Sequence, residues 1–154
     1  MSIFSGVKLG ELALANRIVM APMTRSRSAA DAVPTAMMVD YYSQRASAGL
    51  IISEGIAPSA DGLGYCRTPG LYNEVQVAAW SRVTAGVHAA GGSIVAQLMH
   101  VGRVASQFNK PAGSRTIAPS AIRARGEIYT DQAGMARFDE PRALATDEIG
   151  GVVE

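Results

Sequence analysis

Apolar residues gather in three short runs along the chain, separated by stretches with a helical pattern. The runs are Ile18–Ala21, Leu50–Ser53 and Ser93–Leu98. A run that is apolar on both faces is typical of a strand covered on both sides, as in a parallel sheet. Pro22 follows the first run and ends it, because proline has no N–H to donate to a neighbouring strand. We therefore predict three buried strands at these positions.

Between the first two strands the pattern predicts a helix. It begins after Pro34-Thr35, and apolar and amphipathic side chains recur there at helical spacing, namely Met38, Tyr41, Tyr42 and Arg45. Gly49 stands just past the expected end, where glycine commonly terminates helices.

The clearest helical pattern runs from about Glu74 to Ala90. Asn73 is a candidate N-cap, and Gly91-Gly92 end the helix. One face is marked at intervals of three and four residues by Val77, Trp80, Val83, Thr84 and Val87. The resulting order, strand–helix–strand–helix–strand, predicts a parallel α/β fold.

Two hairpins are predicted outside this repeat. Val7–Leu9 and Leu12–Leu14 flank Gly10-Glu11, where glycine supplies the freedom that a turn needs. Within the irregular stretch 103–145, Ile122–Tyr129 and Met135–Phe138 can pair around a glycine-containing turn. A connection this long is typically functional or an insertion.

Residues 146–149 resemble the first turn of a helix, with two carboxylates near its start. The chain ends at Glu154, within what reads as the opening turns of that helix. We therefore expect residues 1–154 to be the amino-terminal part of a single longer domain.

Composition narrows the class of protein. With 154 residues, 48% of them hydrophobic, the chain is long enough for one domain with a core. A net charge of +1 without a basic stripe argues against nucleic-acid binding. No run of 18 apolar residues and no signal-peptide pattern occurs, and Cys66 is the single cysteine, so we expect a cytoplasmic protein without membrane association. Without an HExxH spacing or a cysteine–histidine cluster, no metal site is expected.

Candidate chemistry lies after each predicted strand, because ligands of parallel β/α folds bind at the carboxyl ends of the strands. That rule selects three places: Ala21–Thr24, Glu54-Gly55, and Gln97 with Met99-His100. The Thr24 hydroxyl can donate or accept, and Gly55 leaves its backbone open to a flat ligand. The planar amide of Gln97 matches the alternating donors and acceptors of a flavin pyrimidine edge.

Taken alone, each of these residues also has an ordinary structural interpretation. Thr24 can cap a loop, Gly55 can serve a turn, and Gln97 can be a hydrogen-bonded core amide. His100 and Arg103 either face the same site or pair locally, and the sequence leaves both readings open. Gly62 and Gly64 do not extend to the GxGxxG pattern, so a Rossmann dinucleotide site is not supported.

Four longer motifs, in order and spread along all 154 residues, resemble the Old Yellow Enzyme family of flavin-dependent ene-reductases. They are Asn16–Arg25, Gly64–Gly70, Gln97–Arg103 and Pro141–Ile149. The resemblance implies a β/α (TIM) barrel, of which this chain would supply the amino-terminal hairpin and about the first three β/α units.

The resemblance also implies roles for particular residues. FMN would lie at the carboxyl ends of the strands, contacted by the backbone of Pro22 and Met23 and lined by Gly55. Thr24 would hydrogen-bond the flavin carbonyl O4, and Gln97 would hold the pyrimidine edge. In the same way Tyr65 would overhang the substrate pocket, and Met99 stands where many relatives carry tryptophan.

The implied reaction is reduction of an activated alkene, with NADPH or NADH as the reductant. In the family, the polar pair that anchors the substrate carbonyl and the proton-donating tyrosine lie beyond position 154. Two alternatives follow: a non-catalytic half-barrel remnant or partner-binding subunit, and another kind of FMN barrel oxidoreductase. A homo-oligomer and a complementary half chain both fit an open sheet edge.

Overall fold

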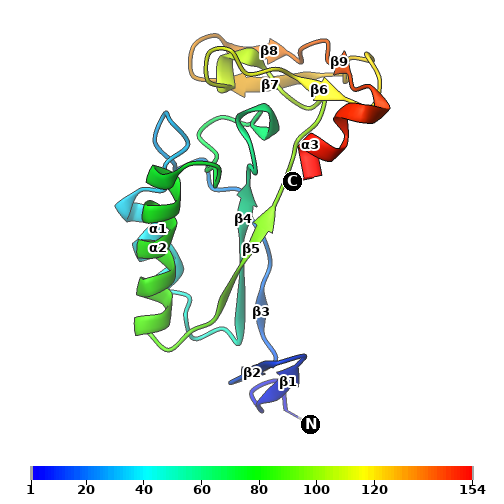
Figure 1. Cartoon of the computed structure of the whole chain (residues 1–154). Coiled ribbons are helices and arrows are strands. Elements are labelled where there is room, and N and C mark those ends of the chain that lie inside the picture. The colour runs from blue at the N-terminus through cyan, green and yellow to red at the C-terminus, as the bar shows by residue number, and fades with distance from the viewer. Residues whose placement is uncertain (1, 154) are drawn as a thin grey trace.

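A computed structural model describes residues 2–153, and its centre is a sheet of three parallel strands (Figure 1). The strands β3 (Val19–Met20), β4 (Leu50–Ile56) and β5 (Ile94–Leu98) follow one another in space as they do in the chain. Both pairings are parallel. The predicted parallel α/β arrangement is therefore confirmed.

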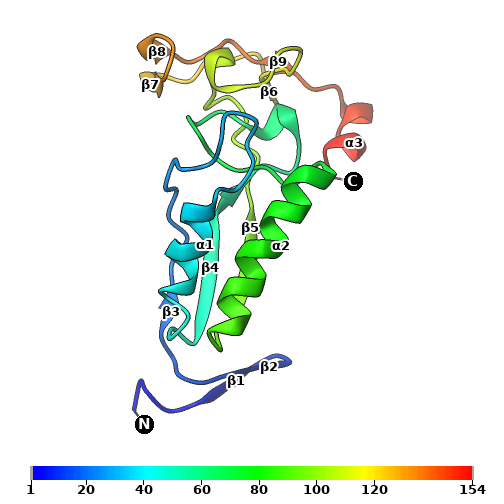
Figure 2. The ribbon, with the colours of Figure 1, turned by 90° about the vertical axis from the view of Figure 1, so that its left-hand side faces the viewer.

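Two helices connect these strands, α1 (Ala36–Ser43) and α2 (Glu74–Ala89), and both lie on the same side of the sheet (Figures 1 and 2). The predicted N-cap of α2 is confirmed, because the Asn73 side chain accepts a hydrogen bond from the backbone N–H of Gln76. Helices and sheet enclose the main core, which consists of Met38, Tyr42, Ala46, Ile51, Ile56, Trp80, Val83 and Val87.

The first helix is shorter than predicted. After Ser43 the chain continues in tight turns, in which the N–H groups of Ala46 and Ala48 each donate to the carbonyl three residues back. These turns bring the chain round into β4 while Ala46 stays in the core. The helical spacing of Arg45 therefore extends past the end of the helix itself.

The buried face of α2 also differs from the prediction at one position. Val77 is 43% exposed, whereas Gln76 and Ala79 are buried in its place. Gln76 is drawn inward because its amide bridges two loops: it accepts from the N–H of Tyr72 and donates to the carbonyl of Asp31. A buried glutamine is stable when both ends of its amide are paired, as they are here.

Strand β4 is longer than predicted and contains a β-bulge between Ile52 and Gly55. Glu54 and Gly55 therefore lie inside the strand, and the expectation that they follow it is wrong. The extra residue breaks the alternation of side chains. As a result Ser53 and Glu54 both face the helices, and Gly55 takes a place on the opposite face.

The prediction that all three strands are covered on both faces is wrong for the outer two. Val19 on β3 is 45% exposed, and Val95 on β5 is 38% exposed. The helices cover only one face of the sheet, and β3 and β5 are its edges. The face away from the helices is called the open face below.

A hairpin of β1 (Val7–Leu9) and β2 (Leu12–Leu14) lies at the amino-terminal end of the sheet, as predicted (Figure 1). Asn16 ties it to the sheet, because its side chain donates to the carbonyl of Ser47 and accepts from the N–H of Gly49.

Residues 103–149 form an excursion beyond the carboxyl ends of the strands (Figure 1). The predicted hairpin is present but shorter, as β7 (Glu127–Thr130) and β8 (Gly134–Arg137). A second pairing, β6 (Ile117–Ala118) with β9 (Arg142–Ala143), was not predicted from the sequence. The remaining elements are short 3₁₀ turns at Ala60–Gly62, Gln107–Asn109 and Thr146–Glu148, followed by helix α3 (Gly150–Val153).

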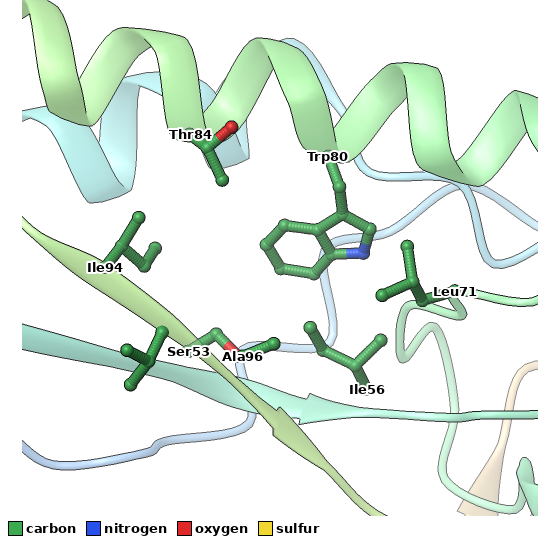
Figure 3. Close-up of a pocket in the computed structure, with 8 residues that line it drawn as sticks. Ser53, Ile56, Leu71, Trp80, Thr84, Ile94 and Ala96 are labelled. Carbon is green, nitrogen blue, oxygen red and sulfur yellow. The ribbon is translucent and has the colours of Figure 1, made fainter.

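Between α2 and the sheet lies an apolar cavity of about 110 Å³ (Figure 3). Trp80 and Thr84 reach into it from the helix, and Ile56 and Ile94 from the strands. The indole N–H of Trp80 donates to the carbonyl of Gly70, 3.1 Å away. The hydroxyls of Ser53 and Thr84, which also line the cavity, donate to the carbonyls of Glu54 and Ser81. The cavity is therefore a packing feature of the helix side.

Candidate functional site

The parallel sheet brings the residues selected after each strand to one end of the molecule. Pro22, Met23 and Thr24 follow β3, Gly55 lies near the end of β4, and Gln97 lies near the end of β5. Because β3, β4 and β5 are adjacent and parallel, these positions lie at the same end of the sheet.

Gly55 and Gln97 are direct neighbours across β4 and β5, paired in register. The Gln97 backbone is fixed, because its N–H donates to the Ser53 hydroxyl at 3.0 Å. Its half-buried side-chain amide makes no hydrogen bond to any of residues 2–153. The backbone that carries this amide is thus fixed, and the polar atoms of the amide itself are free to pair with a ligand.

The open face above Gly55 is occupied by the side chain of Met99. A Cβ atom at position 55 would lie 2.5 Å from Met99 Cε and 2.8 Å from its Sδ. A side chain at position 55 would therefore have to displace the end of the Met99 side chain. The flexible thioether of Met99 can move aside more readily than a rigid side chain.

The segment 22–25 is exposed but anchored. Thr24 is exposed, Met23 is 43% exposed, and the Thr24 hydroxyl makes no hydrogen bond to the described part of the chain. The next residue supplies the anchor, since the backbone N–H of Arg25 donates to Glu54 Oε2 at 3.2 Å. This contact ties the backbone that directly follows Thr24 to β4, while the Thr24 hydroxyl has no hydrogen-bond partner among residues 2–153.

The rule for carboxyl ends of strands selects Glu54 together with Gly55, but it assigns no role to the Glu54 side chain. Its carboxylate is 1% exposed, and Oε1 accepts from the Tyr42 hydroxyl at 3.2 Å. Burial raises the pKa of the Glu54 carboxyl, while the hydrogen bonds from Arg25 and Tyr42 oppose that rise. Burial likewise raises the pKa of Tyr42.

His100 does not join these residues through any contact of its own. Its Nδ1 accepts from the backbone N–H of Gly102 at 3.1 Å, and its Nε2 is buried without a partner among residues 2–153. Burial lowers the pKa of His100, and the nearby Lys110 lowers it further. Of the two interpretations left open by the sequence, this geometry favours the structural one.

Lys110 belongs to a polar cluster that joins the excursion to the loop after β4. Its Nζ donates to the carbonyls of Asp61 and Arg115, at 2.6 and 2.9 Å. Burial lowers the pKa of Lys110 to about 8. The Asp61 carboxylate also accepts two hydrogen bonds from the Arg115 guanidinium.

Tyr65 lies in a different hollow from Gln97. This hollow, of about 660 Å³, is formed by the loops after β3 and β4 and by the excursion, with Phe108 and Lys110 on its walls. None of Pro22–Thr24, Gly55 and Gln97 lines it. The structure thus joins the FMN candidates but does not join Tyr65 to them.

Within residues 2–153 no three histidine, cysteine, aspartate or glutamate side chains are grouped so that they could hold a metal ion. In the same part of the chain, no helix has the length and apolar character needed to cross a membrane.

Comparison with known proteins identifies relatives along the whole chain. It is 40% identical to 12-oxophytodienoate reductase 7 of Oryza sativa, over 99% of this chain and 39% of the relative. It is 41% identical to a chanoclavine-I aldehyde reductase of Penicillium roqueforti, over 96% of this chain and 38% of the relative. The chain therefore spans about two fifths of the length of the curated relatives it matches.

Solved structures give the same result. The old yellow enzyme homologue of Zymomonas mobilis superposes with a TM-score of 0.93 at 45% identity, covering 99% of this chain and 42% of that one. Morphinone reductase in complex with tetrahydroNAD superposes with a TM-score of 0.90 at 46% identity, covering 99% and 43%. The three-stranded sheet thus corresponds to part of a β/α barrel, as predicted, and it is not closed in this chain.

The profile of the NADH:flavin oxidoreductase / NADH oxidase family matches residues 2–154. Together with the relatives above, this match shows that the chain belongs to that family, and the predicted membership of the Old Yellow Enzyme group is confirmed.

Proposed function

We propose that residues 1–154 supply one side of the FMN site of an NAD(P)H-dependent ene-reductase. The observation that carries the proposal is the arrangement of Thr24, Gly55 and Gln97 at the carboxyl ends of three adjacent strands. Two of these residues present polar side-chain groups that the described chain leaves unpaired. The third has no side chain at all.

Each residue has a distinct task at such a site. The Gln97 amide, fixed by its backbone bond to Ser53, offers an acceptor and two donors in one plane to the pyrimidine edge. Thr24 would donate its hydroxyl to the flavin carbonyl O4. The backbone of Pro22 and Met23 would border the ring, and Gly55 would let it approach β4.

When bound, FMN supplies the redox chemistry by passing a hydride from a nicotinamide nucleotide to an activated alkene. The chain's own residues position the ring and exclude water from one of its sides. Met99, packed over Gly55, would set how much room the alkene has there. Tyr65 would contact the substrate from the neighbouring hollow.

The nicotinamide partner is proposed from the relatives as well as from the site. One similar structure is a complex with tetrahydroNAD, and the family description names NADH. NADPH remains the other candidate reductant. The alternative function, a half-barrel that binds a partner without catalysis, is supported by the two uncovered edge strands, where Val19 and Val95 are exposed.

The proposal is tested by titrating the 154-residue chain with FMN and following the quenching of flavin fluorescence. We expect saturable binding to the wild-type chain. Gln97→Leu removes two hydrogen-bond partners, each contributing about 1 kcal/mol, so the dissociation constant should rise by about tenfold or more.

A matched control makes the same chemical change where no flavin is expected. Gln44, exposed after the end of α1, is suited to this, and Gln44→Leu should leave FMN affinity unchanged. If wild-type chain shows no saturable binding, the proposed function is wrong. If Gln97→Leu and Gln44→Leu behave alike, the placement of Gln97 is wrong.

A further inference from the structure

Glu54 is a buried carboxylate that the roles described above leave unexplained. It reaches from β4 to α1 and to the segment after β3, where its two carboxylate oxygens accept from the Arg25 N–H and from the Tyr42 hydroxyl. In addition, its backbone N–H donates to the Tyr42 hydroxyl at 2.8 Å. Glu54 and Tyr42 thus form a closed pair in which every side-chain oxygen has a partner.

Placing a carboxylate there is energetically unfavourable unless its partners compensate. Glu54 borders the core that contains Met38, Tyr42 and Trp80, where charge is poorly solvated. An apolar side chain of similar size is commonly neutral or stabilising at such a site. Stability of the fold therefore does not by itself account for a glutamate at this position.

What an apolar side chain cannot do is accept the Arg25 N–H. This contact, at 3.2 Å, joins residues that are 29 positions apart and connects the loop after β3 to the interior of β4. Arg25 directly follows Thr24, and Glu54 directly precedes Gly55. One hydrogen bond thus fixes the two backbone segments that carry two of the proposed flavin contacts.

The other contacts of Arg25 do not replace this bond. Its guanidinium lies 5.4 Å from the centre of the Tyr41 ring, and its carbonyl accepts from Arg27. Both involve groups beyond the Thr24–Arg25 peptide and leave the orientation of that peptide free. Only the Glu54 contact holds the N–H that immediately follows the Thr24 carbonyl.

The β-bulge explains how Glu54 reaches this place. With regular alternation, residue 54 would share the open face with Ile52, and Gly55 would face the helices. The bulge turns Glu54 toward Tyr42 and the Arg25 backbone, and turns Gly55 toward the proposed flavin. The same irregularity thus places Gly55 on the open face and brings the Glu54 carboxylate to the Arg25 backbone N–H.

We propose that Glu54 is a positioning residue, whose buried carboxylate holds the Arg25 backbone N–H and thereby sets the Thr24 hydroxyl at a fixed place beside Gly55. Its effect on FMN rests on the proposed function, whereas the positioning of the 22–25 segment does not. The two parts are therefore tested separately.

The first test measures amide hydrogen exchange by NMR in the 154-residue chain without flavin. Glu54→Ala removes the acceptor, so exchange at the Arg25 amide should accelerate by about tenfold or more, while the Val83 amide in α2 stays protected. Tyr42→Phe is the matched control, because it removes the other carboxylate partner and should leave Arg25 protected. Unchanged protection of Arg25 in Glu54→Ala would overturn the proposal.

Should Glu54→Ala fail to fold, Glu54→Gln decides the question. Its amide oxygen can accept from Arg25 while its NH₂ donates to the Tyr42 oxygen, so Arg25 should remain protected. Rapid exchange at Arg25 in this variant, with α2 still protected, would show that an acceptor at position 54 does not hold the segment.

The second test uses FMN titration and the visible spectrum of the bound flavin. If Glu54 acts through Thr24, then Glu54→Ala and Thr24→Ala should each weaken FMN binding several-fold and shift the spectrum alike. The double variant should bind no more weakly than Thr24→Ala, since the two share one effect. Additive losses would refute action through Thr24. If the wild-type chain binds no FMN, the proposed function fails, and Arg25 exchange still decides the positioning role.

Discussion

The two faces of the central sheet differ in burial and in the pairing of their polar groups. On the helix side, Ile51, Val83 and Val87 are fully buried and pack against one another. On the open face, Val19 and Val95 are substantially exposed, and the Gln97 amide has no partner within residues 2–153. One face is closed by apolar contacts, and the other presents unpaired polar groups at one end.

This difference separates stability from binding within a single sheet. Apolar area removed from water stabilises the fold on the helix side. Unpaired polar groups contribute nothing to stability, yet they are what a ligand needs. Glu54 is an exception to this separation. Its side chain is buried on the helix side, yet its carboxylate accepts a hydrogen bond from the backbone of Arg25, in the segment that carries Thr24.

The largest expected effect concerns turnover by the 154-residue chain. If the open face is one side of a larger site, the 154-residue chain by itself lacks the groups that anchor the substrate. Its NADPH-dependent reduction of cyclohexenone should then be slower than that of a full-length relative by a factor on the order of 10³. The chain spans only 42% of the Zymomonas mobilis homologue, which is a suitable reference enzyme in the same assay. Robust NADPH-dependent reduction by the chain would contradict the view that the open face is only one side of the site.

A matched pair of substitutions measures the two faces directly. Val83→Ala on α2 removes methyl groups that are fully buried, and should lower the free energy of unfolding by about 2 kcal/mol, including the cavity left behind. Val95→Ala on β5, where the side chain is 38% exposed, should change it by less than about 0.5 kcal/mol. Denaturant unfolding of both variants gives these values, and equal losses would mean that the open face is packed as well.

A smaller effect is expected from Lys110, in the excursion beyond the open end. Burial lowers its folded-state pKa to about 8, below the 10.5 of an unperturbed lysine. Between these two pKa values the unfolded chain binds more protons at Lys110 than the folded chain does, so the free energy of unfolding rises with pH through that window. Well below pH 8 Lys110 is protonated in both states and contributes no pH dependence.

Lys110→Met should abolish this contribution. The melting temperature of wild type relative to the variant should therefore increase between about pH 7 and about pH 10. The comparison must be made as a difference, because the raised pKa values of Cys66 and Tyr42 act in the opposite sense in both proteins. A difference that stays constant with pH would show that Lys110 titrates normally.

The repeat of strands and helices was predictable because its signals are local. Three apolar runs and one helical period with a capping Asn73 place β3, β4, β5 and α2 nearly where they occur. The β6–β9 pairing was not predictable, since each strand has two residues and depends on contacts between distant segments. The end of α1 was missed because the helical spacing of side chains continues into turns that are not helical.

The candidate site likewise has parts that were predictable from the sequence and parts that were not. The rule for carboxyl ends of parallel strands selects Thr24, Gly55 and Gln97 from the sequence, and in the structure Gly55 and Gln97 are paired neighbours while Thr24 follows the adjacent strand β3. The packing of Met99 over Gly55 and the bond from Arg25 to Glu54 were not predicted. Both depend on the bulge in β4, for which the sequence carries no local pattern.

The bulge also constrains how this sequence can diverge. Deleting one residue between Ile52 and Gly55 would remove the bulge, so only one residue would face the helices where Ser53 and Glu54 both do now. Gly55 would keep its place opposite Gln97, but either the hydroxyl that accepts from the Gln97 N–H or the carboxylate that accepts from the Arg25 N–H would be lost. An insertion there would add a further unpaired residue to the strand, whereas the excursion at 103–149 absorbs added residues in loops. Over evolutionary time, length changes should therefore accumulate in the excursion, while the number of residues from Leu50 to Ile56 stays constant.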